Sequence, residues 1–155
     1  MGILDVASNN SIWRGYDYYE KKCVLEWCQV SDTVLEGVVK GNRQEPYYVR
    51  VDLAHPKKSE CDCPHAEGTR KVCKHKMALY FTAFPDEADR LMRAAEAYEQ
   101  ERERQAARLE EMVIARVHKM KKSEVEETLL RFLFEGPEWL FDRFVREYIE
   151  YEEAF

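Results

Sequence analysis

Residues 61–75 read CDCPHAEGTRKVCKH, and this stretch decides the fold. Two short pairs of potential metal ligands, Cys61-x-Cys63 and Cys73-x-His75, flank a loop of nine residues. Three thiolates and one imidazole are a ligand set that suits tetrahedral Zn²⁺. Because the protein fills all four positions, such an ion is structural and has no open position for catalysis. We therefore predict one structural zinc ion held by Cys61, Cys63, Cys73 and His75.

The spacing within each pair predicts the local backbone. In an extended strand, residues i and i+2 point to the same side, so Cys61 and Cys63 can present their sulfurs together. In a regular helix, residues two apart lie about 200° apart around the axis. We therefore expect Cys73 just before a helix and His75 in its first turn. His65 is the alternative fourth ligand, although it lies inside the loop and outside the Cys-x-His frame.

Strand and helix patterns surround this stretch. Residues 23–30, 33–40 and 47–53 are predicted to be strands, because they are rich in β-branched and aromatic residues and the last of them alternates. A short helix is expected at 11–22 and a buried apolar helix at 75–84. The fold class is therefore α+β: a small antiparallel sheet of three or four strands, with a zinc-stapled loop and helix, followed by an all-α C-terminal extension.

The C-terminal extension is predicted to be helical throughout. Residues 86–118 contain no Gly or Pro, Ser123–Glu126 fits a capping box that starts a second helix, and Gly136-Pro137 separates that helix from a third. An apolar stripe on the third helix is usually core, with a partner-binding surface as the alternative. The stripe consists of Leu140, Phe144, Tyr148 and Tyr151.

The charge is distributed unevenly along the chain. The net charge of −6 comes from 24 Lys and Arg against 30 Asp and Glu. Residues 36–80 contain nine basic and six acidic side chains, whereas residues 86–155 contain twelve basic and nineteen acidic ones. This shift predicts two parts with different surfaces, a zinc-binding domain at residues 1–85 and an acidic helical region at residues 86–155.

Six cationic side chains crowd the predicted zinc site. They are open to two interpretations, a phosphate-binding patch or local neutralisation of a zinc–thiolate centre that carries one net negative charge. The six residues are Lys57, Lys58, Arg70, Lys71, Lys74 and Lys76.

The remaining composition limits the class of protein. The sequence shows no apolar stretch of membrane-spanning length and no secretory signal, so we expect a cytoplasmic, intracellular protein with free or metal-bound thiols. Cys23 and Cys28 are expected to pack in the core. No catalytic set of residues is recognisable, so the chain is not expected to be an enzyme. A redox role for Cys63 or Cys73 is a remote alternative.

The metal-ligand pattern CxCx(n)CxH, followed directly by the apolar helix in CKHKMALYF, resembles the SWIM zinc finger. Upstream, the order WRGYDYY, VVKGN and YYVRVDL is similar to that of small bacterial SWIM proteins, so the resemblance extends over about residues 13–84. It implies the same four zinc ligands. SWIM modules accompany Swi/Snf-type ATPases, Mutator-type transposases and ubiquitin-pathway proteins, which implies a role in binding DNA or proteins. No family counterpart is recognisable for residues 86–155.

Two functions are consistent with these features. In the first, the basic finger binds nucleic acid, DNA above all, as part of a larger assembly. In the second, the finger is a rigid scaffold, and the acidic helical tail docks a protein partner such as a Swi/Snf-type ATPase or helicase.

Overall fold

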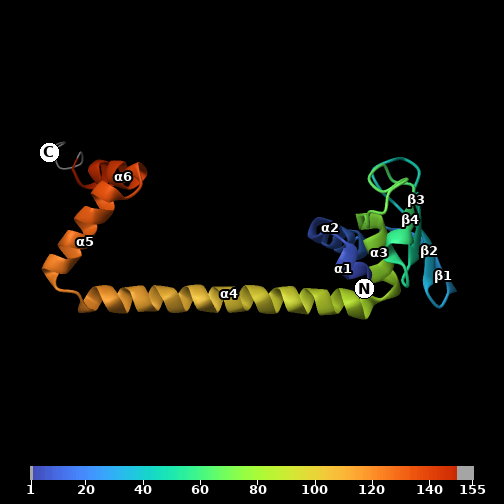
Figure 1. Cartoon of the computed structure of the whole chain (residues 1–155), viewed down its shortest axis with the longest axis horizontal. Helices are drawn as coiled ribbons and strands as arrows, with labels where there is room; N and C mark the ends of the chain where they lie inside the picture. Colours follow the sequence, from blue (N-terminus) through green and yellow to red (C-terminus); the bar gives the residue numbers. More distant parts are fainter. Residues whose placement is uncertain (1, 150–155) are drawn as a thin grey trace. The chain divides into compact units, whose positions relative to one another are not determined.

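The computed structural model describes residues 2–149 (Figure 1). The chain divides into two compact units, Met1–Ala97 and Tyr98–Phe155, which are described separately. The helix α4 (Pro85–Lys119) begins at the last residue of the predicted zinc-binding domain. Its first turns belong to the first unit, because Ala88 is fully buried and Leu91 packs against the core.

The first unit contains a four-stranded antiparallel sheet in the order β1-β2-β3-β4. Its strands are β1 (Val24–Ser31), β2 (Val34–Val39), β3 (Tyr47–Asp52) and β4 (Glu60–Cys61). Each strand pairs with the next one along the chain. The α+β fold class and the antiparallel meander are confirmed.

One face of the sheet carries the core. Tyr47, Val49 and Val51 of β3 and Leu35 and Val39 of β2 are buried, and the residues that alternate with them are partly or fully exposed. The period of two in these strands therefore places one row of apolar side chains against the helices.

Two helices cover this core. The helix α3 (Lys74–Ala83) packs against β2 and β3, and α2 (Asn9–Glu20) packs against α3 (Figure 1). Gly15 makes the contact between the helices possible, because a Cβ at this position would overlap the Cβ of Met77. Gly15 disfavours a helix locally, but it allows α2 to lie close enough to α3 to bury the shared core.

Short elements complete the first unit. The helix α1 (Ile3–Val6) buries Ile3, and the 3₁₀ helix η1 (Pro56–Lys58) lies between β3 and β4. Residues 62–73 form neither helix nor strand. The backbone of this loop must therefore be held by contacts other than regular hydrogen bonding.

The second unit consists of the rest of α4, α5 (Lys122–Glu135) and α6 (Glu138–Tyr148). Gly136 ends α5 and Pro137 precedes α6, as expected. The capping box predicted at Ser123–Glu126 is wrong. The Glu124 carboxylate accepts the N–H of Lys121 at 2.7 Å, so the helix begins two residues earlier.

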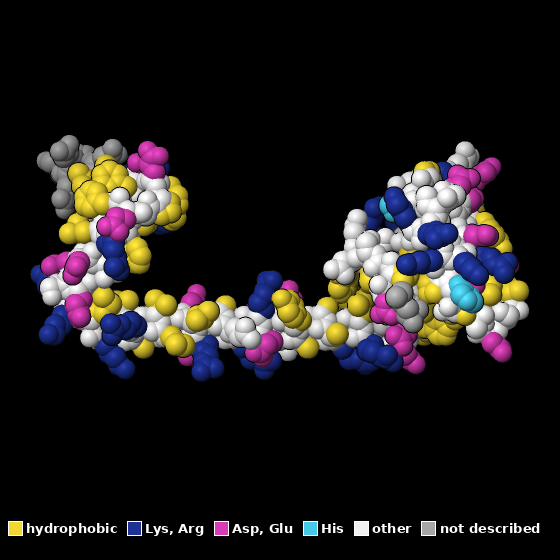
Figure 2. All heavy atoms as spheres, in the orientation of Figure 1, with side chains coloured by type: hydrophobic (Ala, Val, Ile, Leu, Met, Phe, Trp, Pro, Cys, Tyr) yellow, Lys and Arg dark blue, Asp and Glu magenta, His cyan; other side chains and the backbone are white. Residues whose placement is uncertain are grey.

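The second unit buries little of its apolar surface. Leu133 is the one buried hydrophobic residue among residues 98–149, whereas Phe134, Trp139 and Tyr148 are more than 60 % exposed. Figure 2 shows hydrophobic side chains on the surface of α4, α5 and α6. Within the described residues, no helix is both long and apolar enough to cross a membrane.

Candidate metal centre

The four predicted ligands come from three neighbouring segments. Cys61 ends β4, Cys63 follows in the loop, and Cys73 and His75 lie at the start of α3. Cys73 is the N-cap residue with extended backbone, and His75 lies in the first turn, as the spacing predicts. The two-residue strand β4 pairs with β3 through Cys61 and Val49, which fixes one cysteine against the sheet.

The ligand atoms converge on one point. One donor atom from each of Cys61, Cys63, Cys73 and His75 lies within 4.8 Å of the others, and all four residues are buried. The Sγ of Cys61 lies 3.7 Å from Nδ1 of His75. Tetrahedral bonds of zinc to sulfur and nitrogen place these atoms about 3.6 Å apart. The cluster therefore fits a zinc site with Nδ1 as the nitrogen ligand. His65 is exposed and outside this cluster.

Hydrogen bonds within the cluster favour a thiolate at Cys73. The Cys61 thiol, the His75 ring and the backbone N–H of Lys76 all interact with this sulfur, and together they lower the pKa of Cys73 to about 3 against the opposing effect of burial. The hydrogen bond with Cys73 and burial both raise the pKa of Cys61. A metal ion that replaces the shared proton would let all three sulfurs bind as thiolates.

Aromatic packing fixes the orientation of the His75 ring. Tyr47 stacks on it with ring centroids 4.4 Å apart, and Tyr18 contacts it edge-on at 5.4 Å. Gly41 lies against the same group, because a Cβ there would overlap the Tyr47 ring and lie 3.2 Å from Nε2 of His75. These contacts hold the ring with Nδ1 towards the sulfurs, as groups packed around a ligating histidine do in metal sites.

Lys76 is a buried residue that connects two backbone segments and not a surface cation, so its assignment to the phosphate-binding patch is wrong. Its side chain is fully buried. The ammonium donates to the carbonyl of Ser59 at 2.7 Å and to that of Lys71 at 2.8 Å. Ser59 is two residues before Cys61 and Lys71 two before Cys73, so Lys76 ties together the segments that carry both pairs of ligands. Burial lowers the pKa of Lys76, and the neighbouring cysteine sulfurs oppose this shift.

One feature of the sequence indicates that Lys76 is buried, although a count of positive charges does not reveal it. Lys76 is the only charged residue in the run HKMALYF, which forms the buried helix α3. A lysine surrounded by apolar helix residues indicates a buried ammonium with polar partners.

The other five cations lie at the surface in different places. Lys57, Lys58 and Arg70 line one hollow together with His55. Lys71 is exposed, and the ammonium of Lys74 lies 4.4 Å above the ring of Tyr18. The structure thus brings together three of the six residues predicted to form the patch.

Other sequence expectations have mixed outcomes. Cys28 is exposed on the edge strand β1, where most residues are exposed, so its placement in the core is wrong. Cys23 is partly buried against the core. In the predicted partner-binding stripe, Leu140 and Phe144 are half-buried and Tyr148 is exposed; Tyr151 lies outside the described residues.

We predict that the purified chain contains one zinc ion and that Cys63→Ser or His75→Ala abolishes stoichiometric zinc, because a tetrahedral site loses a ligand in each case. Cys28→Ser and His65→Ala are matched controls outside the cluster and should retain the ion. Metal analysis and circular dichroism measure the result.

Chelation should also lower the temperature of the thermal transition, since metal binding contributes to folding. An unchanged transition in the metal-free protein would contradict this prediction.

We predict that Lys76→Met lowers the free energy of unfolding by about 2 kcal/mol or more, because one buried and one partly buried carbonyl lose a charged donor. Zinc affinity should fall about tenfold or more, as it does when the groups that position metal ligands are removed. Denaturant unfolding and competition with a zinc indicator measure these effects. Lys57→Met removes the same charge from an exposed position and should change neither quantity. Equal effects of the two substitutions would exclude this connecting role of Lys76.

The family model of the SWIM zinc finger matches residues 47–84, from the first residue of β3 to the C-cap of α3. The match includes all four residues of the metal cluster. No curated protein and no solved structure matches the chain. The resemblance of residues 13–46 to small bacterial SWIM proteins lies outside the matched range and stays a prediction. Residues 47–84 of this chain therefore match the SWIM zinc finger over a segment that contains the convergent Cys/His cluster.

Proposed function

We propose that this chain is a nucleic-acid-binding module whose SWIM finger is held together by one structural zinc ion. Four protein ligands leave zinc no open position, which supports a role in binding and not in catalysis. DNA within a larger assembly is the ligand that the family resemblance favours.

One observation carries this proposal. Lys57, Lys58, Arg70 and Lys71 are exposed, and none of the four forms an ion pair within residues 2–149. Figure 2 shows Lys and Arg side chains gathered on one face of the first unit. Cations without carboxylate partners are free to replace the counterions of a phosphate backbone.

The metal centre lies between the two segments that carry these cations. Lys57 and Lys58 lie on η1, just before the strand that ends at Cys61, whereas Arg70 lies in the loop just before Cys73. The two segments are separated in the sequence, but the cluster and the hydrogen bonds of Lys76 connect the residues that follow them. An ion at the cluster would therefore fix the spacing of the cations, so loss of zinc should also weaken binding of nucleic acid.

We predict that the chain binds duplex DNA with an affinity that falls steeply as salt increases. Changing Lys57, Lys58, Arg70 and Lys71 to Glu should weaken binding at least tenfold and reduce the slope of log affinity against log salt by up to about 0.9 per lost phosphate contact. Lys21→Glu with Lys22→Glu is the control, because these exposed lysines lie in the same unit at the end of α2. Fluorescence anisotropy over a salt series measures both quantities. Binding that is absent, or whose affinity does not depend on salt, would contradict the proposal.

A second candidate function rests on the helical unit. Large apolar side chains are exposed on α5 and α6, and a surface of this kind is typical of a protein-interaction site. The acidic helical region would then dock a partner, with a Swi/Snf-type ATPase or helicase as the class that the family resemblance favours. This role is compatible with nucleic-acid binding by the first unit.

We predict that Trp139→Ser with Tyr148→Ser weakens binding to a purified Swi/Snf-type ATPase about tenfold or more, since exposed aromatic residues are frequent hot spots of interfaces. Asp142→Ser with Arg146→Ser changes two exposed polar residues of the same helix and is the control. Surface plasmon resonance on the full chain measures both affinities. If both double variants bind as well as the parent, the adaptor function through α6 is excluded.

A further inference from the structure

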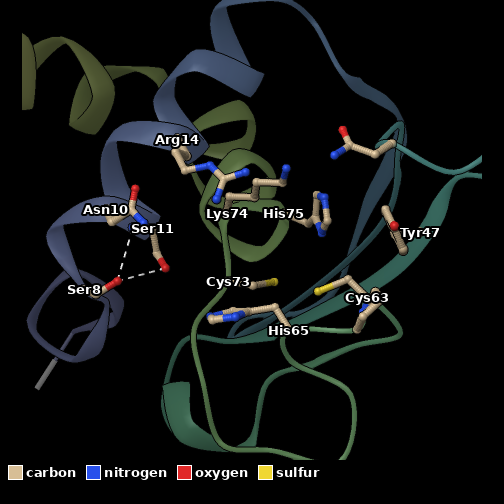
Figure 3. A pocket seen from close by; sticks show the side chains of 12 residues that line it. Ser8, Asn10, Ser11, Arg14, Tyr47, Cys63, His65, Cys73, Lys74 and His75 are labelled. Carbon is tan, nitrogen blue, oxygen red and sulfur yellow. Dashed lines mark hydrogen bonds between the residues drawn. The ribbon is translucent and has the colours of Figure 1, made fainter.

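A hollow of about 410 Å³ lies beside the metal cluster (Figure 3). Twelve residues line it, and none of them is Asp or Glu. Six of the twelve come from the starts of two helices: Ser8, Asn10 and Ser11 at α2, and Cys73, Lys74 and His75 at α3. The hollow is therefore a place where the first turns of both helices meet.

The ends of these helices favour an anion. The helices α2 and α3 contain 12 and 10 residues, so each has a full macrodipole with its positive end at the N-terminus. First-turn N–H groups have no partner within a helix and are the usual donors to phosphate and sulfate oxygens. Ser8 caps one of them through the N–H of Ser11 at 3.2 Å, which leaves the neighbouring N–H groups of the turn for a ligand.

Two cationic side chains extend into the same space. Arg14 and Lys74 both point towards His75, on the side of the ring away from the cysteine sulfurs (Figure 3). Neither forms an ion pair within residues 2–149, and the contact with Tyr18 holds Lys74 in position. A zinc ion with three thiolates and one neutral imidazole carries a net charge of −1. Two cations exceed that charge, so the hollow stays positive beside an occupied centre.

His75 supplies the independent observation that points to a ligand. The residue is 3 % exposed, and its Nε2 is a buried atom without a hydrogen-bond partner. Because Nδ1 faces the sulfurs, a metal-bound neutral ring carries its proton on Nε2. A buried N–H without an acceptor is unfavourable, and the ring lines the hollow into which Arg14 and Lys74 extend. An oxygen acceptor in the hollow would satisfy it once the groups that cover this edge of the ring moved aside.

We propose that this hollow binds a phosphate group, with Arg14, Lys74, the first turns of α2 and α3 and the Nε2–H of His75 as its donors. A tetrahedral oxyanion presents oxygens in several directions, which matches donors that arrive from two helices and a ring edge. The phosphate is either free phosphate or a phosphodiester of nucleic acid. Only the second source rests on the proposed function, since the site itself follows from the geometry.

The direct test titrates inorganic phosphate into the zinc-loaded full chain at constant ionic strength, with chloride as the reference anion, and follows backbone and imidazole signals by NMR. We expect saturable shifts at the amides of Asn10, Ser11, Lys74 and His75, and slower exchange of the Nε2 proton of His75 with water. Arg14→Gln with Lys74→Gln should weaken phosphate binding about tenfold or more, because hydrogen bonds to charged groups are lost. Lys57→Gln with Lys58→Gln removes the same charge from another surface and should leave it unchanged.

The second arm adds a short oligonucleotide to the phosphate-bound protein. Displacement of phosphate, with weaker oligonucleotide binding by the Arg14/Lys74 variant, assigns the site to a phosphodiester. Phosphate binding that the oligonucleotide does not affect assigns it to free phosphate, and holds even if the chain binds no nucleic acid. The site is wrong if phosphate shifts no NMR signals, if the shifted signals belong to other residues, or if the two double variants bind phosphate equally well. Each of these results would leave the proposal of salt-sensitive DNA binding through Lys57 and Lys58 intact.

Discussion

The convergence of four buried ligand side chains is the constraint on which the first unit depends. Residues 62–73 form no helix or strand, and β4 contains only two residues, so regular hydrogen bonding alone cannot hold this part of the chain. Fixing such a loop costs conformational entropy at every residue. A metal ion at the cluster would offset that cost by joining the end of the sheet to the start of α3. The same junction would hold the loop and the start of α3, the helix against which α2 packs.

Lys76 shows how charge and packing are coupled at this junction. A buried ammonium is unfavourable unless hydrogen bonds and opposite charge compensate for its lost hydration. Here two carbonyls accept hydrogen bonds from the ammonium, and the sulfurs of Cys61, Cys63 and Cys73 lie nearby and favour its charged form. One of the six positive charges of the finger thus belongs to the interior. The position of Lys76 favours local neutralisation for this residue, and the patch interpretation is kept for the exposed cations.

Local periodicity explains which features could be predicted from the sequence. Spacing of i and i+2 placed Cys73 before α3 and His75 in its first turn, and the alternation of Tyr47, Val49 and Val51 predicted the buried face of β3. Tertiary neighbours decided the rest. Cys28 is exposed because it lies on β1, an edge strand whose residues are mostly exposed. A glycine is needed at position 15 of α2 because α3 lies too close for a side chain there. The hollow beside His75 joins residues more than 60 positions apart, from Ser8 to His75, which no local pattern reveals.

The two cationic surfaces of the first unit have a common physical origin. One is carried by η1 and the loop before Cys73, and the other by the first turns of α2 and α3. The strand after η1, the loop and the start of α3 supply the ligands of the metal cluster. Such a centre would present phosphate-binding groups at fixed separation, which reduces the entropy lost when several contacts form together. Residues 86–155 carry twelve basic and nineteen acidic side chains and so repel a polyanion. On the proposed function, this distribution would confine phosphate contacts to residues 1–85 and leave the exposed apolar helices of the second unit for a partner of different chemistry.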